Sequence, residues 1–152
     1  MRIPTIAGRI DRRILVNYRV DPDVIREILP APFRPQLVGG FAVAGVCLIR
    51  LRPIRPAALP WRWGLASENA AQRIAVEWGS AEQAQSGVYV LRRDTDSRFN
   101  AWAGGWIFPG VHHLARFDVA ETAGRYRIAV ASRDETTPMT GNQMRIEVQG
   151  RE

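Results

Sequence analysis

Three side chains in this sequence could move a proton at a carbonyl group: Glu68, His112 and His113. Glu68 stands in the polar step Ser67-Glu68-Asn69, just before an apolar stretch, where it could face a cavity or cap a backbone amide in a loop. His112 and His113 are adjacent, so in a strand they point to opposite faces and cannot both bind one metal ion. We expect one of them to face a cavity, with an ordinary hydrogen-bonded histidine as the alternative for each.

The side chains expected to hold a ligand are polar groups and tryptophans. An arginine can bind a carboxylate or polarise an oxygen atom. We expect ligand contacts from Arg73, Arg98, Asn100, Trp61, Trp63, Trp102 and Trp106. The alternatives are a solvated ion-pair network around Arg98 and a hydrophobic plug formed by Trp61 and Trp63.

The basic residues restrict the chemistry, because all 21 of them are arginine and none is lysine. Arginine stays protonated in proteins, so this chain has no side-chain amine that could form a Schiff base. Metal ligands are few, since the chain has two histidines and one cysteine, and these lack zinc-type spacing. We expect the cysteine, Cys47, to be buried. Asp94 and Asp96 are more typical of a helix cap than of a divalent-cation site. We therefore expect neither a metal nor a cofactor.

These side chains must be positioned mainly by β-strands. Apolar alternation predicts strands at Arg13–Val20, Phe41–Ile54, Ala70–Trp78, Gly87–Arg93, His112–Glu121, Arg125–Ser132 and Met144–Val148. Asp21 and Pro22 predict a short helix that ends before Pro30, and a second helical segment is expected over 98–103. Pro53, Pro56 and Pro60 indicate a loop that carries two of the tryptophans. The fold class is therefore α+β and mainly antiparallel, as an open sheet or a barrel.

Strand parity gives a further expectation for Arg73. It shares its parity with Glu77 and differs from Ile74 and Val76. If the apolar parity faces the core, Arg73 faces outward or into a separate polar compartment.

The composition describes an ordinary globular chain, with 152 residues of which 46% are hydrophobic and 24% charged. We expect a single domain over 1–152. No apolar run is long enough to span a membrane and the amino terminus lacks a signal peptide, so the expected location is the cytoplasm. The net charge of +6 permits nucleic-acid binding as a third hypothesis, but acidic residues separate the arginines along the chain.

Several motifs together resemble a known family. These are Asn17–Pro22 with Leu29–Phe33, Ser67–Ala71, Gly87–Val90 with Arg92–Asp94, and Trp106–His113. They resemble the YqjF-like family of uncharacterised domains, which are relatives of acetoacetate decarboxylase. The resemblance implies a β-barrel or cone, decorated with short helices, around a small cavity.

The sequence departs from the decarboxylase where the imine-forming lysine is expected. In that enzyme a Phe-Pro step precedes paired lysines, whereas here Phe108-Pro109 precedes Gly110 and Val111. The resemblance therefore implies the cavity and an acidic residue, matched by Glu68, without the Schiff-base mechanism. The chain also ends soon after Met144–Val148, so it is either a shortened member or a fragment, and a partner copy could cover an open sheet edge in a homo-oligomer.

Two functions from different classes follow. The first is a small-molecule protein that binds an organic acid or carbonyl compound; if it is an enzyme, it uses lysine-independent acid–base chemistry of a lyase or hydrolase type. The second is a non-catalytic binding or structural module in which the histidines only pack.

Overall fold

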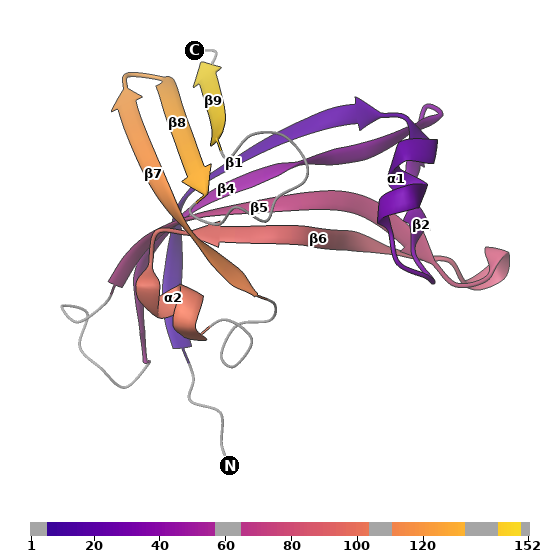
Figure 1. The fold of residues 1–152 in the computed structure, drawn as a ribbon, viewed down its shortest axis with the longest axis horizontal. Coiled ribbons are helices and arrows are strands. Elements are labelled where there is room, and N and C mark those ends of the chain that lie inside the picture. Colours follow the sequence, from indigo (N-terminus) through magenta and orange to yellow (C-terminus); the bar gives the residue numbers. More distant parts are fainter. Residues whose placement is uncertain (1–5, 57–64, 104–110, 133–142, 150–152) are drawn as a thin grey trace. The chain divides into compact units, whose positions relative to one another are not determined.

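The computed structural model describes residues 6–56, 65–103, 111–132 and 143–149. Within these ranges the chain forms nine strands and two α-helices (Figure 1). The strands are β1 (Ile6–Val20), β2 (Arg34–Pro35), β3 (Leu37–Val38), β4 (Phe41–Pro56), β5 (Leu65–Trp78), β6 (Gln85–Thr95), β7 (His112–Thr122), β8 (Arg125–Ser132) and β9 (Gln143–Gln149). The helices are α1 (Pro22–Ile28) and α2 (Arg98–Ala103), and a 3₁₀ helix, η2, spans Ala81–Gln83.

All nine strands belong to one sheet, with the order β1-β4-β5-β6-β7-β8-β9, while β2 pairs with β5 and β3 with β4. β6 and β7 are parallel, and the β7–β8 and β8–β9 pairs are antiparallel. The predicted fold class, α+β with a mainly antiparallel sheet, is confirmed. β1 and β9 stand at the two ends of the strand order, where a partner copy remains a prediction.

The chain divides into two compact units. The first unit comprises Met1–Arg12, Ile49–Ala70 and Arg93–Glu152, and the second comprises Arg13–Leu48 and Ala71–Arg92. β1, β4, β5 and β6 each contribute residues to both units. The expectation of a single domain over 1–152 stays a prediction.

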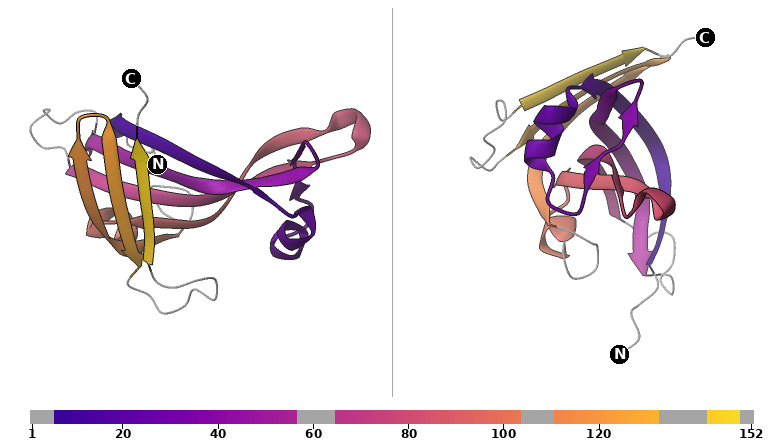
Figure 2. Two further views of the ribbon diagram at one scale, coloured as in Figure 1. Left: turned by 90° about the horizontal axis from the view of Figure 1, so that it is seen from above. Right: turned by 90° about the vertical axis from the view of Figure 1, so that its right-hand side faces the viewer.

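In the first unit, β7, β8 and β9 lie side by side (Figure 2). The β7–β8 turn uses Gly124 with φ of 71°, a left-handed conformation that glycine adopts without strain. Ala115, Ile128, Val130 and Ile146 of these strands are buried. The predicted hairpin and the short last strand are confirmed.

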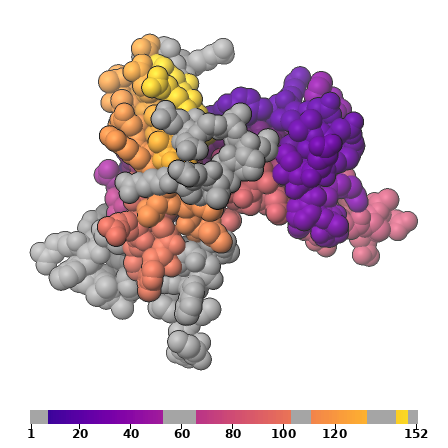
Figure 3. Space-filling model, viewed as in Figure 1, coloured from indigo at the N-terminus to yellow at the C-terminus, as the bar shows by residue number. Residues whose placement is uncertain are grey.

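The second unit contains α1, and its start follows the expected capping chemistry. The Asp21 side chain accepts a hydrogen bond from the Asp23 N–H at 2.9 Å, and Pro22 occupies the first turn. α1 and the segment after it form one compact mass in the space-filling view (Figure 3). The helix buries Ile25, which joins Ala42, Ile74 and Val76 in the core of this unit. Burial of these apolar side chains is the main stabilising contribution here.

Two strands of the second unit approach each other closely at Gly45 of β4. A Cβ atom at this position would lie 2.2 Å from the carbonyl oxygen of Val16 on β1. Only glycine permits this backbone approach. Nearby Cys47 is buried, as predicted.

The end of β4 differs from the sequence expectation. The prolines at 53 and 56 predict a loop, but β4 continues to Pro56. A proline removes only its own N–H from the ladder, so a strand can continue past it where that donor is not needed. Trp61 and Trp63 lie outside the described residues.

Neither helix in the described ranges is long and apolar enough to cross a membrane.

Candidate functional site

Four charged side chains from four strands meet in the first unit. Arg12 of β1, Arg50 of β4, Glu68 of β5 and Glu121 of β7 form what we call the arginine–glutamate cluster. Glu68 bridges both arginines, since its Oε2 accepts from Arg12 Nη2 at 2.7 Å and its Oε1 accepts from Arg50 Nε. Glu121 also bridges them, because its Oε1 pairs with Arg12 Nη1 and lies 2.9 Å from Arg50 Nη2.

The cluster is unevenly buried. The exposed fractions of the side chains are 9% for Arg12, 13% for Glu68, 17% for Arg50 and 36% for Glu121. Burial lowers the pKa of Arg12, the charge of Arg50 acts in the same direction, and Glu68 opposes both. Arg12 Nε is buried and has no hydrogen-bond partner among the described residues. A buried donor of this kind marks a place where a ligand atom or water can be bound.

Alternation along the strands explains why these charges face inward. Glu68 has the same parity on β5 as buried Ala70, and Glu121 has the same parity on β7 as buried Ala115. Arg50 likewise follows Leu48, which is 1% exposed, at a spacing of two. Side chains two residues apart lie on the same face of a strand. The charges therefore extend the apolar faces of their strands.

A second set of polar side chains adjoins Glu68 through the backbone. The Glu68 N–H donates to Asp96 Oδ1 at 2.9 Å, and the Asp96 N–H donates to the Glu68 carbonyl at 3.1 Å. The flanking Ser67 Oγ accepts from Asn69 Nδ2 at 3.0 Å and from Asn100 Nδ2 at 3.1 Å. Partial burial raises the pKa of Asp96, the Glu68 charge adds to this, and the hydrogen bond from the Glu68 backbone opposes it. These contacts fix the backbone that carries Glu68.

The two histidines begin β7. His112 pairs in register with Arg93 and His113 with Asp94, and both histidines are half-buried. His113 has the same strand parity as buried Ala115 and as Glu121, so His113, and not His112, lies on the inner face of β7. The eight residue steps from His113 to Glu121 along extended β7 span about 26 Å. One small ligand therefore cannot touch both side chains, and catalysis by His112 or His113 stays a prediction.

The predicted ligand-binding residues are distributed over several places. Asn100 is 5% exposed and is joined to the Glu68 neighbourhood through Ser67. Arg98 is exposed on α2, and Trp102 of the same helix is 78% exposed. Arg73 belongs to the second unit, where its Nη2 lies 3.5 Å from Asn17 Oδ1. Trp61, Trp63 and Trp106 lie outside the described residues, so their roles remain predictions.

Sequence reasoning identifies Glu68 but misses Arg12, Arg50 and Glu121. Strand alternation could have indicated these residues, because it places a charged residue on the same face as the buried apolar residues next to it on the strand. The arginines that the sequence indicates as ligand contacts are instead Arg73 and Arg98, and Arg98 is exposed.

The cluster can recognise an oxyanion and support proton transfer. Two guanidinium groups provide the planar donors that carboxylates prefer, and Glu68 is a carboxylate held next to them. Among the described residues, no group of three or more His, Cys, Asp or Glu side chains is arranged to hold a metal ion.

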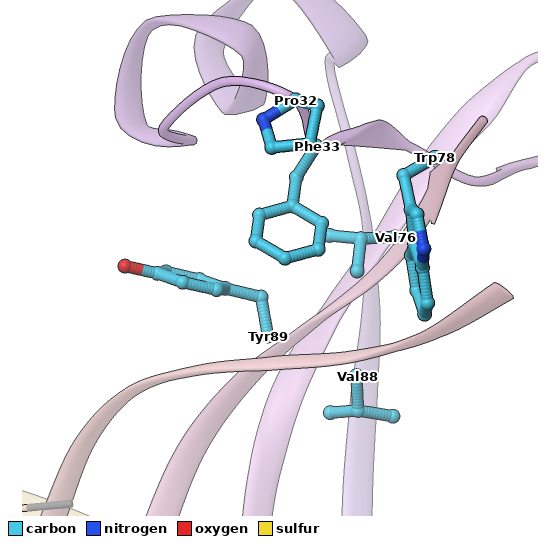
Figure 4. A pocket seen from close by; sticks show the side chains of 6 residues that line it. All are labelled: Pro32, Phe33, Val76, Trp78, Val88 and Tyr89. Atoms are coloured by element: carbon cyan, nitrogen blue, oxygen red, sulfur yellow. The ribbon is translucent and has the colours of Figure 1, made fainter. Parts of the chain in front are cut away.

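The second unit offers a different kind of pocket, with a volume of about 390 Å³. Its walls are Pro32, Phe33, Val76, Trp78, Val88 and Tyr89. Figure 4 shows the Phe33 ring between Tyr89 and Trp78. The Phe33 centroid lies 5.5 Å from that of Trp78 and 5.7 Å from that of Tyr89. The pocket continues the apolar core of this unit, since Val76 belongs to both.

Comparison with known families decides where the chain belongs. Residues 8–152 match DUF2071, a family described as an uncharacterized conserved protein. The chain belongs to the DUF2071 family. This confirms the resemblance on which the sequence expectation was based. Among curated protein sequences, none matches the chain.

Solved structures similar to this DUF2071 protein show its fold. The enduracididine biosynthesis enzyme MppR, complexed with pyruvate, is similar with a TM-score of 0.64 and 18% identity, over 99% of this chain and 60% of that one. Acetoacetate decarboxylase from Legionella pneumophila is similar with a TM-score of 0.58 and 18% identity, over 86% of this chain and 48% of that one. The chain thus spans about half to three fifths of the length of these proteins. The predicted acetoacetate decarboxylase-like fold is confirmed.

Proposed function

We propose that this DUF2071 protein binds a small organic acid or carbonyl compound at the arginine–glutamate cluster. The observation that carries the proposal is the pair of largely buried guanidinium groups, Arg12 and Arg50, with a donor on Arg12 that no described residue satisfies. Leaving a buried donor unsatisfied costs about 1–3 kcal/mol, and a bound oxygen atom would offset that cost.

The ligand class is supported by the fold comparison. MppR has a related fold and its structure contains pyruvate. A carboxylate or carbonyl oxygen is also the group that guanidinium donors bind best. Both lines favour a compact acid over a long apolar ligand.

If the protein is an enzyme, Glu68 is its proton-transfer group. Glu68 is held by two arginines and by the Asp96 backbone contacts, so its position relative to a bound carbonyl is fixed. Arginine would hold or polarise the oxygen while Glu68 moves the proton. A non-catalytic binding module is the alternative, and turnover measurements with bound acids separate the two.

Titration with pyruvate tests the binding proposal. We expect pyruvate to bind the natural chain and to lose at least tenfold in affinity in Arg50→Gln, because one of the two guanidinium donors is removed. Arg127→Gln is the matched control, since Arg127 is 59% exposed and pairs with Glu147 on β9. Calorimetry gives the affinities, and equal binding by all three proteins would place the ligand elsewhere.

Borohydride trapping tests whether an imine forms. Because the chain has no lysine, reduction in the presence of pyruvate or acetoacetate should leave no adduct on an internal residue. Intact mass measurement followed by peptide mapping reads out the result. A stoichiometric adduct on an internal peptide would contradict the lysine-independent chemistry.

A further inference from the structure

The two carboxylates of the cluster are held in different ways. Glu68 uses both oxygens, one for each arginine, and its side chain is 13% exposed. Glu121 uses Oε1 for both arginines, is 36% exposed, and lies next to the last residue of β7 before the turn. Each glutamate contacts both arginines, but Glu121 is the more exposed of the two, so it is the member that can leave the cluster directly into solvent.

The charge balance of the cluster limits how an acid can enter it. Two arginines and two glutamates give a formal charge of zero, and three of the four side chains are largely buried. An added carboxylate would leave one negative charge uncompensated in a poorly solvated place, which is costly. An acid is accommodated at lower cost if one of the two glutamates withdraws.

We propose that the carboxylate of Glu121 occupies the place where the carboxylate of a ligand binds, and that a ligand displaces it. This inference rests on the proposed function. Arg12 Nη1 and Arg50 Nη2 converge on one oxygen of Glu121, as they would on an oxygen of a bound acid. The displaced Glu121 side chain moves into solvent beside the β7–β8 turn, so the number of charges in the cluster does not change.

Displacement makes Glu121 an intramolecular competitor. A group tethered next to its own site acts at an effective concentration in the millimolar range or above. The natural chain should therefore bind simple carboxylates weakly, and an acid with further groups that reach Arg12 Nε would have the advantage. Glu121 thereby selects against acids that offer only a carboxylate.

Acetate and its neutral isostere acetamide provide the probes. We expect acetate to bind Glu121→Ala at least tenfold more tightly than the natural chain, because the competing carboxylate is gone. Acetamide should gain much less, since it carries no charge to replace. Glu147→Ala is the control, because it also removes one negative charge, from an exposed pair in which Glu147 lies 3.5 Å from Arg127. It should bind acetate as the natural chain does.

The outcomes separate the inference from the proposed function. An equal change in acetate affinity for Glu121→Ala and Glu147→Ala, or no change in either, would overturn the displacement alone. Absence of acetate and pyruvate binding in every protein, Glu121→Ala included, would overturn the proposed function as well. If Glu121→Ala does not fold, Glu121→Gln removes the charge with nearly the same shape, and the same tenfold gain over Glu147→Gln is expected.

Discussion

Both units bury apolar side chains, but they differ in what else their strands place inside. The first unit brings two arginines and two glutamates together, whereas the second buries Ile25, Ala42, Ile74 and Val76 and lines an apolar pocket with aromatic rings. β5 supplies members to both, with Glu68 in one unit and Ile74 and Val76 in the other, all at one parity. One strand can thus contribute a candidate binding group to one unit and core residues to the other.

The physical difference lies in desolvation. Burial of apolar side chains stabilises the fold directly, while a buried ion pair must first recover the cost of removing both charges from water. The first unit holds an arrangement that contributes little net stability, as expected if it serves the proposed ligand binding. The second holds the arrangement expected of a core.

The largest effect should follow removal of a charge from the arginine–glutamate cluster. Glu68→Gln leaves Arg12 and Arg50 with Glu121 alone, and breaking a buried pair in this way costs about 3–5 kcal/mol. Urea unfolding measures the loss. A change below about 1 kcal/mol would show that the cluster is solvated like a surface pair and would remove the contrast between the units.

A somewhat smaller effect is expected in the apolar core. Ile74→Ala removes a side chain that is 1% exposed and should lower the free energy of unfolding by about 2–4 kcal/mol, through lost burial and the cavity left behind. Pyruvate binding by the variant at low denaturant should be unchanged. A loss of binding as large as that in Arg50→Gln would show that the two units are functionally inseparable.

An ion pair in the second unit tests whether burial distinguishes the arginine–glutamate cluster, because it also joins an arginine to a glutamate but is not buried. Arg34 Nε lies 2.8 Å from Glu77 Oε1, with exposed fractions of 46% and 35%. Arg34→Gln should cost less than about 1 kcal/mol in urea unfolding. A cost equal to that of Glu68→Gln would mean that burial is not what distinguishes the cluster.

The smallest effect is a pH dependence centred on Asp96. Its pKa is raised above the ordinary value of 3.8, so the folded protein binds this proton more tightly than the unfolded chain does. The Asp96 contribution to the free energy of unfolding therefore falls as the pH rises from 3.8 through the raised pKa. Asp96→Asn keeps the acceptor for the Glu68 N–H and removes the titration.

Urea unfolding at a series of pH values rising from 3.8 measures this dependence. The stability of Asp96→Asn relative to the natural chain should increase with pH over that interval. Asp118→Asn, an exposed position on β7, is the control. A constant difference for Asp96→Asn would contradict the raised pKa.

Much of the fold was predictable because its signals are local. The Asp21-Pro22-Asp23 step specifies the start of α1 within three residues, and alternation specifies the long strands. β2 and β3 have two residues each, which is too short for a periodic pattern. β4 passes the predicted proline boundary because strand pairing, which is non-local, outweighs the local signal.

The candidate site was predictable only in part. Glu68 stands out because it belongs to a polar step just before an apolar stretch. Arg12 and Glu121 are separated by 109 positions, and their pairing depends on the order and register of four strands. Charge alone could not single them out, since 21 arginines are distributed along the chain.

Gly45 bears on how members of this family should be compared. A side chain there would collide with the Val16 carbonyl whatever ligand the protein binds, so the constraint on this position comes from backbone geometry. A relative that retains the glycine has retained the approach of two strands, and it can still have exchanged every charge in the cluster. Different residues therefore show whether two members share the fold and whether they share the site. Before an activity is transferred from one member to another, the residues to compare are Arg12, Arg50, Glu68 and Glu121.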